Sequence, residues 1–263
     1  MKLSIVIAAR NDNYLPRLLR SLFVLRQFSE RNGFSPELIV VEWNPLPGCL
    51  TLPEIFEATK THARIITVSN EIHRAQRGAD AMPFFEYQAK NVGIRRSCEE
   101  YVLCCNCDGI FSEGLVKVLG SSEGTDCAYY RANRHDVKMG NAWGSTPEEI
   151  IESCKWNTYK VVLADEGAAG DFTLMHRDRW HEIHGNPELV SDDTIDTYTT
   201  VLARARGMLQ IVFSEGLYHQ GHASQRDGWP SIGGGTGIDK DATCRENEDS
   251  WGLAGIDLPE VTV

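Results

Sequence analysis

The sequence predicts an α/β fold in which a mostly parallel central sheet has helices on both faces. Two observations in the first half of the chain predict it. Short apolar runs rich in strand formers alternate with segments of helical periodicity. Each run is also followed at once by polar residues, as expected where buried parallel strands reach the edge of an open sheet.

The first half contains four expected strands and three expected helices. The strands are residues 2–8, 37–41, 64–68 and 101–105. The first helix should begin after Asn13, whose side chain can cap it, with Pro16 in its first turn and leucines at helical spacing through Leu25. The other helices are expected near residues 53–61 and over residues 84–97.

The second half is less regular. Helices are expected over residues 112–119, after a capping box that begins at Thr146, around Trp180, and from a cap at Ser191 to residue 205. The expected strands are 127–131, 161–163, 210–213 and 216–219. No internal repeat and no linker divides the chain, so we expect a single domain over residues 1–263.

Composition excludes several classes of function. The formal net charge of −11 argues against a broad nucleic-acid surface or an anionic membrane face. No apolar stretch is long enough to span a bilayer, and the N-terminal run is too short for a secretory signal. The eight cysteines lack a regular spacing, which fits reduced thiols better than a disulfide framework. We therefore expect a cytoplasmic protein with no transmembrane segment and no nucleic-acid partner.

Asp108 is the first candidate for chemistry. It follows the apolar run 101–105 and precedes Gly109, at the position where open α/β sheets place their ligands. One interpretation is that Asp108 holds a divalent metal, which in turn holds a nucleotide diphosphate. The other is that Asp108 only begins a turn, because Asp-Gly is a common turn pair.

Polar side chains also follow the other three expected strands. They are Arg10 and Asp12 after the first strand, Glu42 at the end of the second, and Asn70, Arg74 and Arg77 after the third. Together they suit a nucleotide site, although each alone also fits a helix cap or a solvated loop. The two arginines either face solvent or neutralise phosphate. Neither of the familiar glycine-based phosphate cradles, GxGxxG after the first strand or GxxxxGK[ST], is present.

Three segments of the first half resemble family 2-type glycosyltransferases with the GT-A fold. SIVIAARND is similar to their first strand and loop, ELIVVEWNP to their second strand, and QAKNVGIRRSCEEYVLCCNCDGIFSEGLV to their N-x-G and DxD segment. This resemblance, over roughly the first 120 residues, implies binding of a nucleotide sugar with a divalent metal. By carry-over, Asp12 and Glu42 would contact the base or ribose, and Asn91 would lie near the sugar nucleotide. Asp108 would take the last DxD position, whereas the first position is Asn106, one carboxylate short of the pattern.

The segment from residue 170 to 207 resembles the acceptor-side part of the same superfamily, which carries the catalytic acid. Asp192 and Asp193 match its acidic pair, and Asp171 is a rival. The structural alternative is that acids in the first turn of a helix are favoured by the backbone dipole. The resemblance divides the domain into a nucleotide-binding half (1–120), an acceptor-side half (121–237) and an acidic C-terminal tail (238–263).

His219 and His222 lie three residues apart after an expected strand. A pair of surface histidines is the ordinary explanation. Enzymes with the GT-A fold, however, often use a late histidine as a ligand to the DxD metal. On the resemblance, these histidines would offset the carboxylate missing at Asn106. An imidazole ligand shifts the preference from Mg²⁺ toward Mn²⁺.

The function implied by the resemblance is metal-dependent transfer of a sugar from a nucleotide-diphosphate sugar to an acceptor. The expected donor is a UDP-sugar, and the acceptor is a hydroxyl of a carbohydrate or another molecule. If the reaction inverts configuration, Asp193 or Asp192 would take the acceptor proton, and retention stays open. One alternative is a sugar nucleotidyltransferase, whose expected loop rich in glycine and arginine is absent. The other is a non-catalytic nucleotide- or carbohydrate-binding domain, which Asn106 favours.

Overall fold

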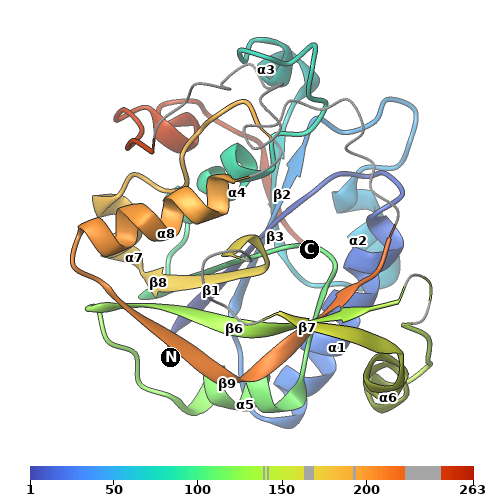
Figure 1. The fold of residues 1–263 in the computed structure, drawn as a ribbon. Helices are drawn as coiled ribbons and strands as arrows, with labels where there is room; N and C mark the ends of the chain where they lie inside the picture. The colour runs from blue at the N-terminus through green and yellow to red at the C-terminus, as the bar shows by residue number, and fades with distance from the viewer. Residues whose placement is uncertain (139, 141, 163–168, 192–193, 223–243) are drawn as a thin grey trace.

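The structure is a computed structural model, and it describes every residue except 139, 141, 163–168, 192–193 and 223–243 (Figure 1). One ten-stranded sheet organises it in the order β10-β3-β2-β1-β4-β8-β6-β9-β5, with β7 paired to β6. The strands are β1 (Leu3–Ala9), β2 (Glu37–Trp43), β3 (Arg64–Val68), β4 (Tyr101–Cys105), β5 (Gly109–Phe111), β6 (Ala128–Val137), β7 (Thr158–Val162), β8 (Phe172–His176), β9 (Leu209–Gln220) and β10 (Glu260–Thr262).

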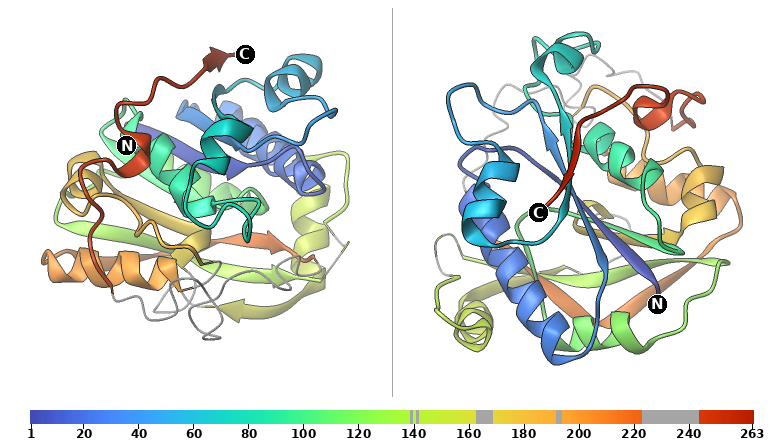
Figure 2. Two further views of the ribbon diagram at one scale, coloured as in Figure 1. Left: turned by 90° about the horizontal axis from the view of Figure 1, so that it is seen from above. Right: turned by 180° about the vertical axis from the view of Figure 1, so that it is seen from behind.

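The helices are distributed over both faces of this sheet, as predicted (Figure 2). They are α1 (Leu15–Arg31), α2 (Leu52–Thr59), α3 (Asn70–Arg74), α4 (Glu86–Arg95), α5 (Glu113–Ser121), α6 (Pro147–Asn157), α7 (Arg177–Glu182) and α8 (Ile195–Ala205), with short 3₁₀ turns η1 (Ala169–Asp171) and η2 (Trp251–Leu253). Strands β3, β2, β1 and β4 are parallel neighbours. The parallel sheet predicted for the first half is therefore confirmed.

Alternate residues of β1 face two different cores. Ile5 and Ile7 belong to the core that includes apolar residues of α1 and α5, whereas Val6 and Ala8 belong to the core that includes α4. This alternation follows from the two-residue period of a strand. It explains why the run is apolar throughout, since neither face of β1 meets water.

Gly93 allows α4 to pack unusually close to β1. A Cβ atom at this position would lie 2.4 Å from Cγ1 of Val6, a distance that no real side chain accepts. The close approach gives the glycine of the expected N-x-G segment a packing role. It also places α4 against the face of β1 and β2 at Val6 and Val41.

Beyond β5 the sheet becomes mixed. Strand β8 is antiparallel to β4 and β6, and β9 is parallel to β6 but antiparallel to β5. The expected strands 210–213 and 216–219 form the single strand β9. Its register on β6 shifts after the pair Ala132–Phe213, because Asn133 pairs next with Gly216 and leaves Ser214 and Glu215 without partners on β6. This bulge bends β9 toward β5.

Two expected helix caps are wrong. Helix α1 begins after Tyr14, without a side-chain cap, and the backbone before it is fixed by Asp12, whose Oδ1 accepts the N–H of Tyr14 at 2.9 Å. Asn13 is exposed and caps nothing. Helix α8 begins after Thr194, whose left-handed backbone (φ 69°) makes the turn into the helix, so Ser191 lies too early to cap it.

The segment 238–263, expected as a tail, is partly built into the fold over its described residues. Trp251 is buried in the core on the α4 side, and Arg96 donates to the carbonyl oxygens of Gly252 and Leu253. Strand β10 then pairs antiparallel with β3, as the red segment in Figure 2 shows. The three residues of β10 are all exposed, so their sequence carries no burial pattern that could have predicted the strand.

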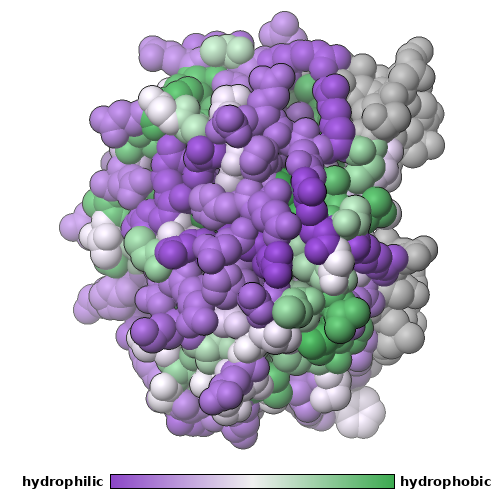
Figure 3. All heavy atoms as spheres, turned by 90° about the vertical axis from the view of Figure 1, so that its left-hand side faces the viewer, coloured by the Kyte–Doolittle hydropathy of each residue, from purple (hydrophilic) through white to green (hydrophobic). Residues whose placement is uncertain are grey.

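No helix in the described part of the chain is long and apolar enough to cross a membrane. The face shown in Figure 3 is largely hydrophilic, with hydrophobic residues in small separate areas.

Candidate metal centre

Asp108 lies where the buried strand β4 ends and the chain turns into β5. Its residue is 3% exposed. Its Oδ2 atom lies 3.3 Å from Nε2 of His219 and 3.1 Å from Nε2 of His222. Its Oδ1 atom is buried and has no hydrogen-bond partner among the described residues. A buried carboxylate oxygen without a donor is costly, so this atom is available for a cation.

Strand pairing brings the two histidines to Asp108 from far along the chain. In the antiparallel pair of β5 and β9, His219 is opposite Gly109, the residue that follows Asp108. His222 comes just after the end of β9. One ligand atom from each of Asp108, His219 and His222 can be chosen so that all three lie within 4.8 Å of one another. The three residues therefore form a possible metal site.

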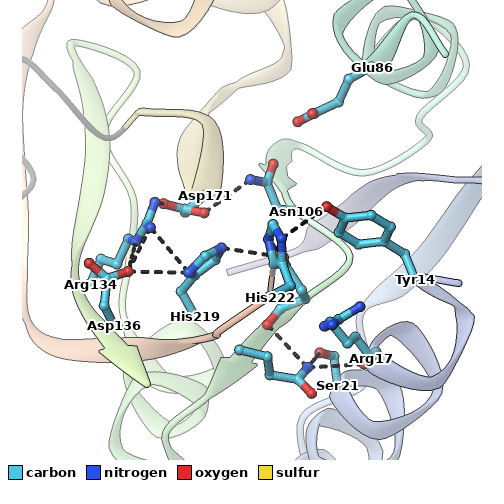
Figure 4. Close-up of polar contacts among 12 residues, drawn as sticks. Tyr14, Arg17, Ser21, Glu86, Asn106, Arg134, Asp136, Asp171, His219 and His222 are labelled. Carbon is cyan, nitrogen blue, oxygen red and sulfur yellow. Dashed lines mark hydrogen bonds and ion pairs between the residues drawn. The ribbon is translucent and has the colours of Figure 1, made fainter. Parts of the chain in front are cut away.

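Both histidines present Nε2 to Asp108 because their Nδ1 atoms have other partners (Figure 4). Nδ1 of His219 lies 3.2 Å from Oδ1 of Asp136. Nδ1 of His222 lies 3.0 Å from the hydroxyl of Tyr14. Such outer contacts fix the ring orientation of metal-binding histidines.

The charges of the site are strongly coupled. Burial raises the pKa of Asp108, but hydrogen bonds from His219 and His222 outweigh it and hold the pKa well below its usual range. Burial lowers the pKa of His219, but Asp108 and Asp136 raise it to about 9. The pKa of Asp136 falls to about 2, mainly through its hydrogen bond with His219. Without a metal, His219 is therefore a cation between two carboxylates at neutral pH.

A second charged cluster lies behind His219. Arg134 contacts Asp136 at 2.6 Å and Asp171 at 2.7 Å, and it lies 3.1 Å from Nδ1 of His219. Because the raised pKa keeps a proton on His219, its Nδ1 donates to Asp136 rather than accepting from Arg134. Burial raises the pKa of Asp171, and Arg134 counteracts that rise. Both Asp171 oxygens are engaged, one by Arg134 and the other by Asn106.

The side-chain amide of Asn106, at the first DxD position, accepts one hydrogen bond and donates another to its neighbours. Its Oδ1 accepts from Nζ of Lys90 at 2.6 Å, and its Nδ2 donates to Oδ1 of Asp171 at 3.0 Å. Lys90 is fully buried and also pairs with Glu86 at 2.6 Å. An aspartate at position 106 would keep the lysine contact but would face Asp171 with a second negative charge.

Three predicted donor-binding residues follow parallel strands at the same sheet edge as Asp108, with Arg10 and Asp12 on a loop and Asn70 as the first residue of α3. Arg10 donates from Nε to the carbonyl oxygen of Asn44 at 2.7 Å, and Asn70 donates to the side-chain oxygen of Asn44. Asp12 is half-buried, and its burial raises the pKa of its carboxyl group. The loops after β1, β2 and β3 meet here because these strands are parallel.

Glu42 and Asn91 are placed differently from the expectation, since both are 0% exposed. Glu42 accepts the backbone N–H of Leu52 at 2.7 Å, which ties β2 to the start of α2. Asn91 donates to the carbonyl oxygen of Asn186 at 2.8 Å and to Glu188 at 3.0 Å. In this structure their polar atoms bind other parts of the protein, and the nucleotide contact expected for Glu42 and the place near the sugar nucleotide expected for Asn91 stay predictions.

Of the remaining predicted residues, Arg74 and Arg77 lie on the protein surface. Arg74 ends α3 and Arg77 follows it, and both are exposed. Asp192 and Asp193 lie outside the described residues. Asp196, on the first turn of α8, accepts the backbone N–H of Gly170 at 3.0 Å, next to Asp171.

Sequence reasoning missed four residues of the site, namely Tyr14, Lys90, Arg134 and Asp136. Arg134 and Asp136 alternate on β6, which extends past the predicted end at residue 131. A charged residue at every second position of a strand signals one polar face, and that signal was present. Lys90 lay within the quoted N-x-G segment, but nothing in the sequence marked it as buried.

Neither a family model nor a curated protein matches the sequence. Solved structures do resemble the fold. The mannosyltransferase PcManGT from Pyrobaculum calidifontis, in complex with GDP-Man and Mn²⁺, is 14% identical with a TM-score of 0.53, over 86% of this chain and 58% of that one. The catalytic domain of Drosophila beta1,4galactosyltransferase 7, with xylobiose, is 12% identical with a TM-score of 0.56, over 97% of this chain and 84% of that one. S. aureus TarS 1–349 is 14% identical with a TM-score of 0.53, over 84% of this chain and 60% of that one.

These structures confirm the GT-A fold predicted from the sequence. The chain spans less than two thirds of the mannosyltransferase and of TarS. At such low identities the likeness concerns the fold, and the chemistry of this chain has to be argued from its own residues.

Proposed function

We propose that this chain transfers a sugar from a nucleotide-diphosphate sugar, with a UDP-sugar as the donor, to a hydroxyl group of a carbohydrate or another acceptor. One observation carries the proposal. At the ligand-binding edge of the sheet, a buried carboxylate with an unpartnered oxygen faces two imidazoles whose ring orientations are fixed. Support comes from structures of the same fold in complex with GDP-Man and Mn²⁺ and with manganese, UDP-Gal and xylobiose.

The residues present fit a divalent cation. Asp108 would supply an oxygen ligand, and His219 and His222 would supply nitrogen ligands. Imidazole nitrogen favours Mn²⁺ over Mg²⁺, which prefers an all-oxygen environment. A cation held there would stabilise the negative charge that develops on the leaving diphosphate.

The protein's own residues would hold the donor and the acceptor. We assign Arg10, Asp12 and Asn70 to the nucleoside side of the donor, because they share the sheet edge with Asp108. The exposed Arg74 and Arg77 stay proposed phosphate contacts. Asp136 keeps the ring of His219 in place, whatever the donor sugar.

The acceptor proton needs a carboxylate if the reaction inverts configuration. Asp193 and Asp192 stay our first candidates from the sequence. Asp171 is the second, because burial raises the pKa of its carboxyl group. Its two oxygens already accept from Arg134 and Asn106, so Asp171 would have to exchange one of these contacts for the acceptor hydroxyl.

Thermal unfolding with a panel of nucleotide sugars, with and without Mn²⁺, tests the donor. The true donor nucleotide should raise the unfolding midpoint, and Mn²⁺ should enlarge the rise, because ligand binding stabilises the native state by mass action. Hydrolysis of the stabilising nucleotide sugar should then stop in EDTA and in Asp108→Asn. The matched control is Asp178→Asn, whose carboxylate is 80% exposed on α7. Full turnover in EDTA, with Asp108→Asn unaffected, would remove the metal from this function.

The single domain, its division at residues 120 and 237, and the cytoplasmic location stay predictions of the sequence.

A further inference from the structure

A basic cavity lies beside the C-terminal end of β9, at Gln220 and Gly221. It has a volume of about 190 Å³ and lies between the first turns of α1, the residues after β6 and the end of β9. The lining residues that matter are Arg17, Arg20, Lys138, Trp143, Gln220 and Gly221. In a chain with a net charge of −11, three cations around one cavity create a local positive potential.

The arginines of this cavity contact uncharged partners. Arg17 donates from Nη1 to the carbonyl oxygen of Asn13 at 3.3 Å, and Arg20 donates from Nη1 to Oε1 of Gln220 at 2.5 Å. Within the described residues, no carboxylate forms an ion pair with Arg17, Arg20 or Lys138. Their remaining N–H groups are therefore suited to an anionic ligand.

Gln220 gives the cavity a fixed wall. It is 2% exposed, and its side-chain nitrogen donates to Oγ of Ser21 at 3.0 Å and to the carbonyl oxygen of Asp108 at 3.1 Å. Its side-chain oxygen accepts from Arg20. The same side chain thus contacts one cation of the cavity, Arg20, and the backbone of Asp108. Gly221 lines the cavity directly before His222, so the cavity adjoins the proposed metal ligands.

The rim of the cavity suits a sugar. Trp143 is 67% exposed, and the guanidinium carbon of Arg20 lies 5.8 Å from the centre of its ring. An exposed indole ring offers an apolar face that can pack against a sugar ring. The cavity is smaller than the roughly 300–1,000 Å³ of sites that enclose a whole drug-sized ligand. It is the right size for one charged group rather than for a complete acceptor.

We propose that this cavity binds an anionic group, a phosphate or a carboxylate, carried by the acceptor sugar. The inference rests on the proposed function and narrows its acceptor to an anionic carbohydrate. None of Asp108, His219 and His222 is among the described residues that line the cavity. The donor diphosphate at the metal and the anion of the acceptor therefore occupy separate sites on either side of residues 220–222.

Binding of glucose 6-phosphate, with glucose and inorganic phosphate as companions, tests the cavity. Thermal unfolding is measured without metal or nucleotide, at constant ionic strength. We expect glucose 6-phosphate and inorganic phosphate to raise the unfolding midpoint and glucose to leave it unchanged. Lys138→Met and Arg17→Met should each weaken the apparent affinity by about tenfold, the cost of losing one charge-assisted hydrogen bond. Lys155→Met, an exposed lysine on α6, is the matched control and should bind as the wild type does.

A second arm of the experiment separates an acceptor site from a donor site. UDP with Mn²⁺ is added to wild-type protein that is saturated with glucose 6-phosphate. The rise in the unfolding midpoint caused by UDP should add to the rise caused by glucose 6-phosphate. If UDP abolishes the rise in the unfolding midpoint that glucose 6-phosphate causes, the cavity binds the donor diphosphate and the inference is overturned. Equal phosphate affinity in wild type, Lys138→Met and Arg17→Met also overturns it. If neither UDP nor GDP binds while Lys138→Met still loses the phosphate response, the proposed donor fails and the anion site stands.

Discussion

The two histidines that face Asp108 are held in different ways. His219 lies within β9 and is flanked by two carboxylates, Asp108 and Asp136. His222 lies beyond the strand and is held by the uncharged hydroxyl of Tyr14, whose ring meets it edge-on at 4.9 Å between centroids. Both imidazoles contact Asp108, but the second partner of His219 is a carboxylate, whereas the second partner of His222 is an uncharged hydroxyl. We therefore expect His219 and His222 to respond differently to mutation and to pH.

The largest effect on Mn²⁺ affinity is expected at Asp108, the residue that both histidines contact. Asp108→Asn removes the only carboxylate that both imidazoles contact within the described residues. We expect the Mn²⁺ affinity to fall by at least about a hundredfold, because even residues behind a metal ligand change affinity by roughly 10–100-fold. Calorimetric titration with Mn²⁺ measures this, with Asp178→Asn as control. An affinity within threefold of the wild-type value would place the metal elsewhere.

Removing each histidine tests the comparison directly. His219→Ala leaves the buried Asp108 and Asp136 without their shared cation, so we expect metal-free protein to lose about 1–3 kcal/mol of unfolding free energy. His222→Ala should cost less than about 1 kcal/mol, because its ring is half-buried and Tyr14 can turn to water. Urea unfolding of both variants measures the difference. Equal losses would mean that charge does not distinguish the two ligands.

The pH dependence sharpens the same contrast. The pKa of His219 is raised from 6.5 to about 9, so its ion pairs stabilise the metal-free fold fully below pH 6.5 and less as the pH rises through 9. We expect the unfolding free energy of metal-free protein to fall by about 1–3 kcal/mol over this window, less than the full shift implies. In His219→Ala the decline should largely disappear.

Proton release on metal binding is an independent test of whether His219 is protonated in the metal-free protein. A divalent cation on Nε2 of His219 displaces the proton held there, so binding at pH 7.5 should release about one proton. Calorimetric titration with Mn²⁺ in buffers of different ionisation enthalpy counts the protons. A count near zero would show that His219 is not protonated in the metal-free protein or does not bind the metal.

The smallest effects on Mn²⁺ affinity are expected from Asp136 and Tyr14, the residues that contact the Nδ1 atoms of the two histidines. Asp136→Asn keeps a hydrogen bond to His219 but removes its charge, so the Mn²⁺ affinity should fall by about tenfold. Tyr14→Phe keeps the ring packing against His222 and removes only the hydroxyl, so a fall of about two- to threefold is expected. If Tyr14→Phe weakens binding more than Asp136→Asn, the contrast between charged and uncharged support is reversed.

The parallel half of the fold could be predicted because its strands are buried on both faces. Residues such as Ile5 and Val6 face opposite cores, so the run is apolar without interruption and stands out in the sequence. The mixed half was harder to predict. In strand β6 the alternation of Arg134 and Asp136 marked a polar face, but the predicted strand ended at residue 131. Strand β10 owes its existence to pairing with β3 alone.

The candidate site could be predicted only where a local pattern marked it. Asp108 follows a buried strand, His219 lies at the end of another and His222 just after it, so each had a signal within a few residues. Their meeting depends on the pairing of β5 with β9, which joins segments more than a hundred positions apart. The buried partner Lys90 had no signal, because a lysine in a helix is ordinarily exposed.

The bulge in β9 sets a rule for the length of this strand. Ser214 and Glu215 are an even insertion, so His219 keeps the face that it would have in an uninterrupted strand. Deleting both residues would preserve that parity, whereas deleting one would turn His219 to the opposite face and present its neighbour to Asp108. A change of length at this bulge should therefore keep His219 on its present face only when an even number of residues is added or removed between Phe213 and Gly216, which constrains any redesign of this strand.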